Sequence, residues 1–207
     1  PNVQSFSIVL SAWSTSRSAK GAERAEMVLL RMRQLYESDD LDTEPDVVRY
    51  SSVLDCWAKS SSKGSAEKAE KIFREMQDLY KSGDNDLKPD VVSYNTVINA
   101  YAKAGNADRA EAILEEMYQE YEQGNHDAKP DVRSFSTVLS AWAKSRSAKG
   151  AERAEMIHVR MKKLYESGEF DTKPDVFSYN SVMDCWAKSS SKGSAEKAEK
   201  IYREMQD

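Results

Sequence analysis

The chain has 207 residues, of which 31% are charged and 40% hydrophobic, and it carries a formal net charge of −5 at pH 7. No apolar run approaches the ~20 residues that a membrane-spanning helix needs. Two cysteines and two histidines do not form a disulfide framework or a metal-ligand pattern, so no metal or other cofactor is expected. The start at Pro1 carries no recognisable targeting leader and suggests a piece of a longer polypeptide.

A repeated segment organises the whole sequence. It opens at a valine that follows Pro-Asp or its equivalent, and the opening valines lie 44, 44, 41 and 44 residues apart. The sequence therefore predicts a single array over residues 1–207 with five repeats, 3–46, 47–90, 91–131, 132–175 and 176–207, the last incomplete. Repeats four and five closely copy repeats one and two, with an offset of 129 residues, which indicates duplication or design.

Each repeat begins with a segment that is typical of an amphipathic helix. An aspartate precedes the opening valine of repeats two to five, where its carboxylate can accept the free backbone N–H groups of the first helical turn. In repeat three the apolar residues recur at spacings of three and four, and they are Val91, Tyr94, Val97, Ile98 and Tyr101. The first helix is expected to end near a lysine, at Lys59, Lys103, Lys144 or Lys188. Cys56 and Cys185 fall on this helix and are expected to be small buried hydrophobic residues.

A second helix follows a short turn, with Ser65 and Asn106 as expected N-caps. Its apolar stripe persists to a tyrosine near the end, at Tyr36, Tyr80, Tyr121 and Tyr165, and a polar link then leads to the next repeat. One such hairpin cannot cover its own apolar faces, whereas stacked hairpins can. The expected fold is all-α, an α-solenoid that forms a right-handed superhelix of stacked antiparallel helical hairpins.

The segment PDVVSYNTVINAYAKAGNADRAEAILEEM at residues 89–117 resembles the pentatricopeptide repeat, a helical-hairpin family that binds single-stranded RNA. The resemblance extends over all five repeats, although the family's usual unit is shorter and the additional residues fall at helix ends. The tetratricopeptide repeat, which binds proteins, has a similar period, but its Trp, Leu-Gly-Tyr and Pro pattern is absent. The resemblance implies single-stranded RNA as the partner rather than DNA or a membrane, and a mitochondrial or plastid location.

The family reads about one base per repeat with two polar side chains. These are the fifth residue from the opening valine and the residue before the next opening valine. The resemblance assigns base reading to Ser7 with Asp46, Ser51 with Asp90, Asn95 with Asp131, Ser136 with Asp175, and Asn180. By the family's pairing rule, this set implies G-G-U-G-(U/C) from the RNA 5′ end. For the aspartates, helix capping alone is the competing explanation.

Two further stripes belong to the same face of the first helix. The second residue of each repeat would stack against bases, as it does in the family, at Gln4, Val48, Val92, Arg133 and Phe177. The residue at the helix end would hold RNA phosphates, at Lys59, Lys103, Lys144 and Lys188. These lysines also suit the negative end of the helix dipole, which is the alternative explanation.

The net charge of −5 is unusual for an RNA-binding protein. However, the thirteen-residue first helices hold six basic residues and two acidic ones, so the acidic excess lies in the second helices, links and caps. No nucleophile elbow, phosphate loop or metal-ligand cluster indicates an enzyme. His126 falls in a polar link, and His158 is expected to be a half-buried packing residue. The alternative function is a protein-binding helical scaffold, or a structural subunit of a larger assembly, without RNA readout.

Overall fold

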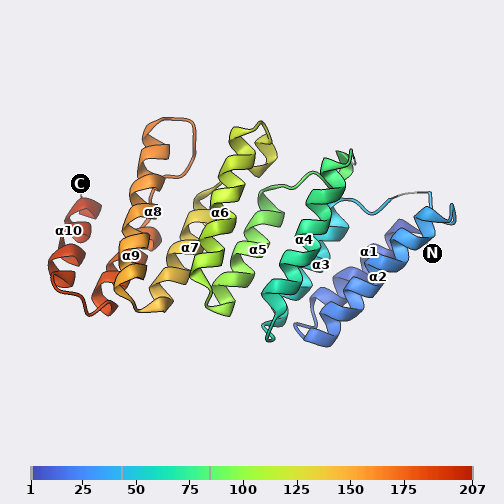
Figure 1. Ribbon diagram of the computed structural model, residues 1–207, viewed down its shortest axis with the longest axis horizontal. Helices are drawn as coiled ribbons and strands as arrows, with labels where there is room; N and C mark the ends of the chain where they lie inside the picture. Colours follow the sequence, from blue (N-terminus) through green and yellow to red (C-terminus); the bar gives the residue numbers. More distant parts are fainter. Residues whose placement is uncertain (1, 43, 84, 207) are drawn as a thin grey trace. The chain divides into compact units, whose positions relative to one another are not determined.

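The computed structural model describes residues 2–42, 44–83 and 85–206. Within these ranges the chain is helical and contains no β-strand. The first helices of the five repeats are α1 (Val3–Ser14), α3 (Val47–Ser60), α5 (Val91–Ala104), α7 (Val132–Ser145) and α9 (Val176–Lys188). The second helices are α2 (Ala19–Glu37), α4 (Ser65–Lys81), α6 (Ala107–Glu122), α8 (Ala148–Glu166) and α10 (Ser194–Gln206), and two short 3₁₀ helices, η1 (Asn85–Leu87) and η2 (His126–Ala128), lie in the links (Figure 1).

The predicted helix boundaries are confirmed to within a residue for the first helices of repeats two to five. Each of these helices begins at the residue after an aspartate and ends at the predicted lysine or one residue beyond it. The long second helices are also confirmed, because α2, α4, α6 and α8 all end one residue after their predicted tyrosine. Both helices of each hairpin are therefore continuous up to their predicted ends.

One of the two predicted N-caps of the second helices is wrong. Asn106 caps α6, since its side chain accepts the backbone N–H of Arg109 at 3.0 Å. Ser65 is instead the first residue of α4, and Gly64 occupies the cap position with a φ of 79°. The left-handed backbone that this turn requires is available to glycine without steric cost, so the turn needs no side-chain cap.

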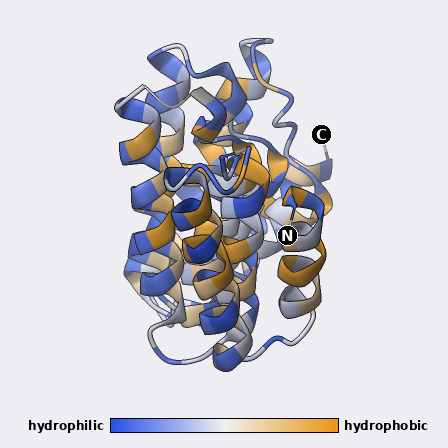
Figure 2. Ribbon diagram, turned by 90° about the vertical axis from the view of Figure 1, so that its right-hand side faces the viewer, coloured by the Kyte–Doolittle hydropathy of each residue, from blue (hydrophilic) through white to orange (hydrophobic). Residues whose placement is uncertain are grey.

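The apolar stripes of both helices form the core of the stacked hairpins. Tyr94, Val97 and Ile98 of α5 are fully buried, as predicted from their spacing. In the first half of the chain, the rings of Phe73 and Tyr94 meet edge-to-face with centroids 4.8 Å apart. Figure 2 shows hydrophobic and hydrophilic residues on different sides of single helices, the pattern expected when one face packs against neighbours.

The links between repeats are not merely polar connections. Each contains one buried hydrophobic residue, at Leu41, Leu87, Ala128 or Phe170. The Phe170 ring lies 5.0 Å from the ring of Tyr121 and 5.9 Å from that of Tyr118, both on α6. The lengthened link is therefore held against a second helix by an apolar side chain rather than left in solvent.

His158 is more buried than predicted. Only 1% of it is exposed, and its ring packs against Tyr179 with centroids 4.5 Å apart. Burial lowers the pKa of this imidazole because the charged form is poorly solvated there. Cys56 and Cys185 are buried free thiols, as predicted.

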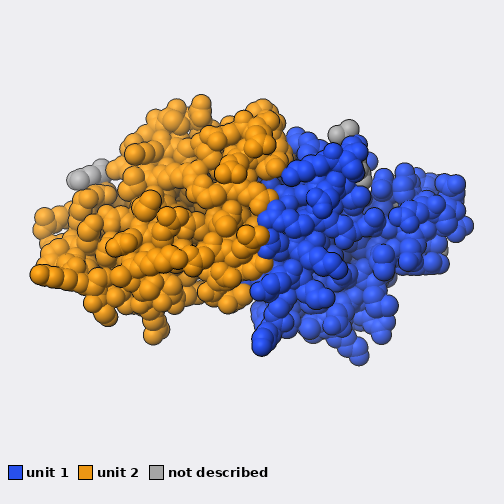
Figure 3. Space-filling model, in the orientation of Figure 1, with its two compact units in different colours: residues 1–100 blue, residues 101–207 orange. Residues whose placement is uncertain are grey.

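The described residues divide into two compact units, residues 1–100 and 101–207 (Figure 3). The first unit holds α1 to α4 and most of α5, and the second holds the end of α5 and α6 to α10. No helix in the described ranges combines the length and the apolar character needed to cross a membrane.

Candidate functional site

The second residue of every repeat is exposed on its first helix. Gln4, Val48, Val92, Arg133 and Phe177 are all solvent-accessible, and more than half of the Val48, Val92 and Phe177 surface is exposed. An apolar side chain in solvent does not stabilise the fold, whereas covering it with a ligand would be favourable because apolar surface would leave water. This position is therefore available to stack against a flat ligand.

The fifth residues of repeats two to five differ in their burial and in their hydrogen bonding. Ser51 and Ser136 have buried hydroxyl oxygens without a hydrogen-bond partner among the described residues. Asn95 is buried in the first unit, whereas Asn180 is exposed in the second. A helical serine commonly donates to the carbonyl four residues earlier, as the neighbouring Ser52 does to Val48 at 2.8 Å. Ser51 and Ser136 make no such bond and keep their hydrogen-bonding capacity.

The four predicted aspartates all act as N-caps. In each, the Oδ1 atom accepts one or two backbone N–H groups at 2.8–3.1 Å, at Asp46, Asp90, Asp131 and Asp175. A carboxylate has a second oxygen with its own lone pairs, so capping leaves room for another role. The structure thus confirms capping and is compatible with base reading by the same side chain.

The predicted reader pair of repeat one contacts Arg49, which is the third residue of repeat two. Arg49 donates from Nη2 to the Ser7 hydroxyl at 2.8 Å and from Nη1 to Asp46 Oδ2 at 2.6 Å. The predicted partners Ser7 and Asp46 thus meet at one guanidinium. No sequence signal in repeat one indicates this contact, because Arg49 belongs to the next repeat.

In the second unit, several predicted residues line one groove between α7 and α9. Its volume is about 800 Å³. The predicted stacking residue Phe177, the predicted base reader Asn180 and the predicted phosphate ligands Lys144 and Lys188 all line it. Ser140 and Asp184, which lie one helical turn before the two lysines, line it as well. Arg146 also lines the groove, from a left-handed position just after α7. An apolar ring, an amide and three cationic side chains, one of them neutralised by Asp184, surround the groove, and such a set is suited to a ligand that has both aromatic and anionic parts.

The lysines at the helix ends are not equivalent. Lys59 pairs with Asp55 at 2.5 Å and Lys188 with Asp184 at 2.6 Å, both across one helical turn. Lys144 has a serine, Ser140, at that preceding position, and its ammonium lies 3.5 Å from the backbone carbonyl of Ala102. Lys103 is exposed. Of Lys59, Lys144 and Lys188, only Lys144 therefore has no carboxylate that neutralises it one turn earlier on its helix.

Models of the PPR repeat match three separate parts of the chain, residues 50–79, 85–118 and 177–207. These parts lie mainly in repeats two, three and five of the sequence. The chain belongs to the pentatricopeptide repeat family.

One solved structure supports the fold of this pentatricopeptide repeat protein. The crystal structure of the pentatricopeptide repeat protein PPR10 from maize matches the whole chain with a TM-score of 0.61 at 22% sequence identity. Two structures of PPR10 in complex with an 18-nt psaJ RNA element match 99% of the chain at 21% identity and a TM-score of 0.47. The fold is thus the α-solenoid that the sequence predicts, while the handedness of the superhelix stays a prediction.

The chain spans 24% of the maize crystal structure and 30% of the chains in the two RNA complexes. No curated protein sequence matches it.

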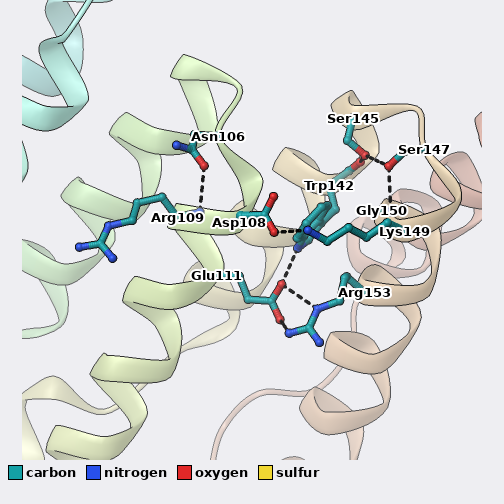
Figure 4. A network of polar contacts seen from close by, with 10 residues as sticks. All are labelled: Asn106, Asp108, Arg109, Glu111, Trp142, Ser145, Ser147, Lys149, Gly150 and Arg153. Atoms are coloured by element: carbon teal, nitrogen blue, oxygen red, sulfur yellow. Dashed lines mark hydrogen bonds and ion pairs between the residues drawn. The ribbon is translucent and has the colours of Figure 1, made fainter.

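Away from the groove, the pentatricopeptide repeats are joined by buried polar contacts between hairpins (Figure 4). The Glu111 carboxylate on α6 accepts the indole N–H of Trp142 on α7 at 2.8 Å and is paired with the guanidinium of Arg153 on α8. Repeat one makes the matching contact, from Trp57 to Glu26 at 3.2 Å. These contacts account for the glutamate after alanine in the second helices of repeats one and three, residues to which the sequence alone assigns no partner.

Proposed function

We propose that this pentatricopeptide repeat chain binds single-stranded RNA along its first helices and selects bases one repeat at a time. The observation that supports this most directly is the groove between α7 and α9. Phe177 supplies an exposed ring for stacking, Asn180 an amide for a base edge, and Lys144 a cation for a phosphate. These are the roles that the family resemblance assigns to the three residues.

The arrangement suits a nucleic-acid strand better than a compact anion. Stacking on aromatic and apolar faces tolerates any base, whereas hydrogen bonds to base edges discriminate among them. The hydroxyl oxygens of Ser51 and Ser136 are buried and have no hydrogen-bond partner among the described residues, so each would have to rotate toward the ligand to meet a base edge. The family's pairing rule then assigns guanine to repeats one, two and four, uracil to repeat three, and a pyrimidine to repeat five.

Fluorescence anisotropy with labelled GGUGU and CCACA, each between constant adenosine flanks, tests the proposal. Because the two RNAs differ at every position, we expect GGUGU to bind at least tenfold more tightly, which corresponds to at least about 1.4 kcal/mol. Asn180→Ala should reduce the discrimination at the fifth nucleotide, and Phe177→Ala should weaken both RNAs. Equal binding of the two RNAs would contradict base reading.

A matched control separates groove contacts from general charge. Lys162 is an exposed lysine on α8 that does not line the groove. Lys162→Ala removes the same charge as Lys144→Ala, so only the latter should flatten the salt dependence of binding, by about 0.7 in the log–log slope for one lost phosphate contact. Equal effects of the two variants would show that charge acts without a defined site.

A protein-binding scaffold is the second candidate, and one observation favours it. A groove of about 940 Å³ lies between α8 and the turn that joins α9 to α10, lined among others by Met156, Val159 and Trp186. Met156 and Val159 are exposed apolar residues on α8, and exposed apolar surface is typical of protein contacts. A folded chain that binds neither RNA would favour this function.

A further inference from the structure

The repeat-one pair differs from the other predicted reader pairs because an arginine occupies it. The Arg49 guanidinium bridges the Ser7 hydroxyl and the outer oxygen of Asp46, at 2.8 and 2.6 Å. Only 19% of the Arg49 side chain is exposed, and its Nε atom is buried. The bridging group is therefore held against the protein rather than extended into solvent.

Every polar atom of this pair is engaged. The Ser7 hydroxyl donates to the backbone carbonyl of Val3 at 2.9 Å and accepts from Arg49. Asp46 accepts two backbone N–H groups at Oδ1, both at 3.1 Å, and the Arg49 guanidinium at Oδ2. A base edge that approached this pair would have to displace a charge-assisted hydrogen bond, which is among the stronger kinds in proteins.

For the pairs Ser51 with Asp90 and Ser136 with Asp175, the position that corresponds to Arg49 holds a serine. The third residue of repeats three, four and five is a buried serine, Ser93, Ser134 or Ser178. Each of these serines hydrogen-bonds the aspartate just before its own helix. In agreement, the fifth residues Ser51 and Ser136 have hydroxyls with no partner in the described part of the chain.

We propose that Arg49 determines the specificity of repeat one by closing its reader pair, so that the chain accepts any base at the first nucleotide. The proposal rests on the proposed RNA-binding function and changes its first position only. Repeat one still offers Gln4 for stacking, so a nucleotide can be bound there without being identified. Arg49→Ser installs the residue that repeats three to five already carry, and it should open the pair to guanine.

The test measures binding of the 207-residue chain to four RNAs that differ at the first nucleotide of NGUGU, and to four that differ at the second nucleotide of GNUGU. For the unmodified chain, we expect dissociation constants within about twofold across the first series and about tenfold preference for guanine in the second. For Arg49→Ser, we expect about tenfold preference for guanine in both series. Circular dichroism and thermal unfolding check that the variant is folded.

Two results would overturn the inference separately from the function. The first is a tenfold guanine preference of the unmodified chain at the first nucleotide, which needs no variant. The second is a folded Arg49→Ser chain that still accepts any base at the first nucleotide while it discriminates at the second. Loss of discrimination at the second nucleotide in both chains would instead remove the base-reading function and the inference with it. Arg49→Lys, which keeps the charge but lacks the planar fork that bridges two partners, should gain part of the preference if the bridge is what closes the pair.

Discussion

The Glu111 contacts between hairpins make a prediction about stability. Glu111 is 5% exposed, and it is bonded to Trp142 and Arg153. Removing the carboxylate in Glu111→Ala loses hydrogen bonds to a charged group, and it leaves the buried Trp142 N–H without a partner, which costs about 1–3 kcal/mol. Arg153 adds less, because its side chain is 40% exposed and water can solvate the freed guanidinium. We expect a total loss of about 2–3 kcal/mol in the free energy of unfolding.

The chain supplies a control at the same position of the next repeat. Glu155 is paired with Lys197 at 3.3 Å, and the indole N–H of Trp186 has no partner among the described residues. Glu155→Ala makes the same change in helix propensity but should cost less than about 1 kcal/mol, as a partly exposed ion pair does. Urea unfolding followed by circular dichroism measures both variants. Costs that agree within about 0.5 kcal/mol would refute the assignment of stability to the Trp142 contact.

Three further predictions follow from single contacts. Lys144→Ala should weaken RNA binding more than Lys188→Ala, because Asp184 already neutralises Lys188; equal losses in anisotropy titrations would argue against this. Burial lowers the pKa of His158 below its usual 6.5, so the unfolded chain is protonated at a higher pH than the folded chain, and stability should fall as the pH drops below about 6.5. Urea titrations at several pH values should show a smaller fall for His158→Phe. An unchanged pH dependence would assign the fall to other groups. Gly150→Ala should destabilise the fold by about 1–3 kcal/mol, because the new Cβ would lie 2.1 Å from a serine oxygen and 3.1 Å from a backbone carbonyl; a thermal melt at the unmodified temperature would show that the turn relaxes.

The helices and their caps could be predicted because their causes are local. Spacings of three and four place Tyr94, Val97 and Ile98 on one face, and an aspartate before each opening valine can reach only the next few N–H groups. The misassigned cap at Ser65 is instructive. Both Gly64 and Ser65 can start a helix, and the choice between them depends on a left-handed turn that the sequence pattern does not display.

The contacts between repeats could not be predicted, because they join side chains that are far apart in sequence. Trp142 meets Glu111 across 31 residues, and Arg49 meets Ser7 across 42. Hydrophobic periodicity determines which face of a helix is buried, but it does not determine which polar residue of a neighbouring hairpin faces it. The same limit explains the buried Phe170 in a link that reads as polar by composition.

Residue identity alone assigns the same base to Ser7 with Asp46 and to Ser51 with Asp90. In the structure these two pairs have unequal hydrogen-bonding capacity, since the Ser7 hydroxyl already donates one hydrogen bond and accepts another, whereas the Ser51 hydroxyl has no partner among the described residues. A group can discriminate between ligands only with hydrogen bonds that the free protein has not already satisfied, because an exchange of equivalent bonds yields little net free energy. The third residue of the following repeat therefore belongs to the description of a reader pair, and the pairing rule should hold where that residue is a serine and fail where it is Arg49.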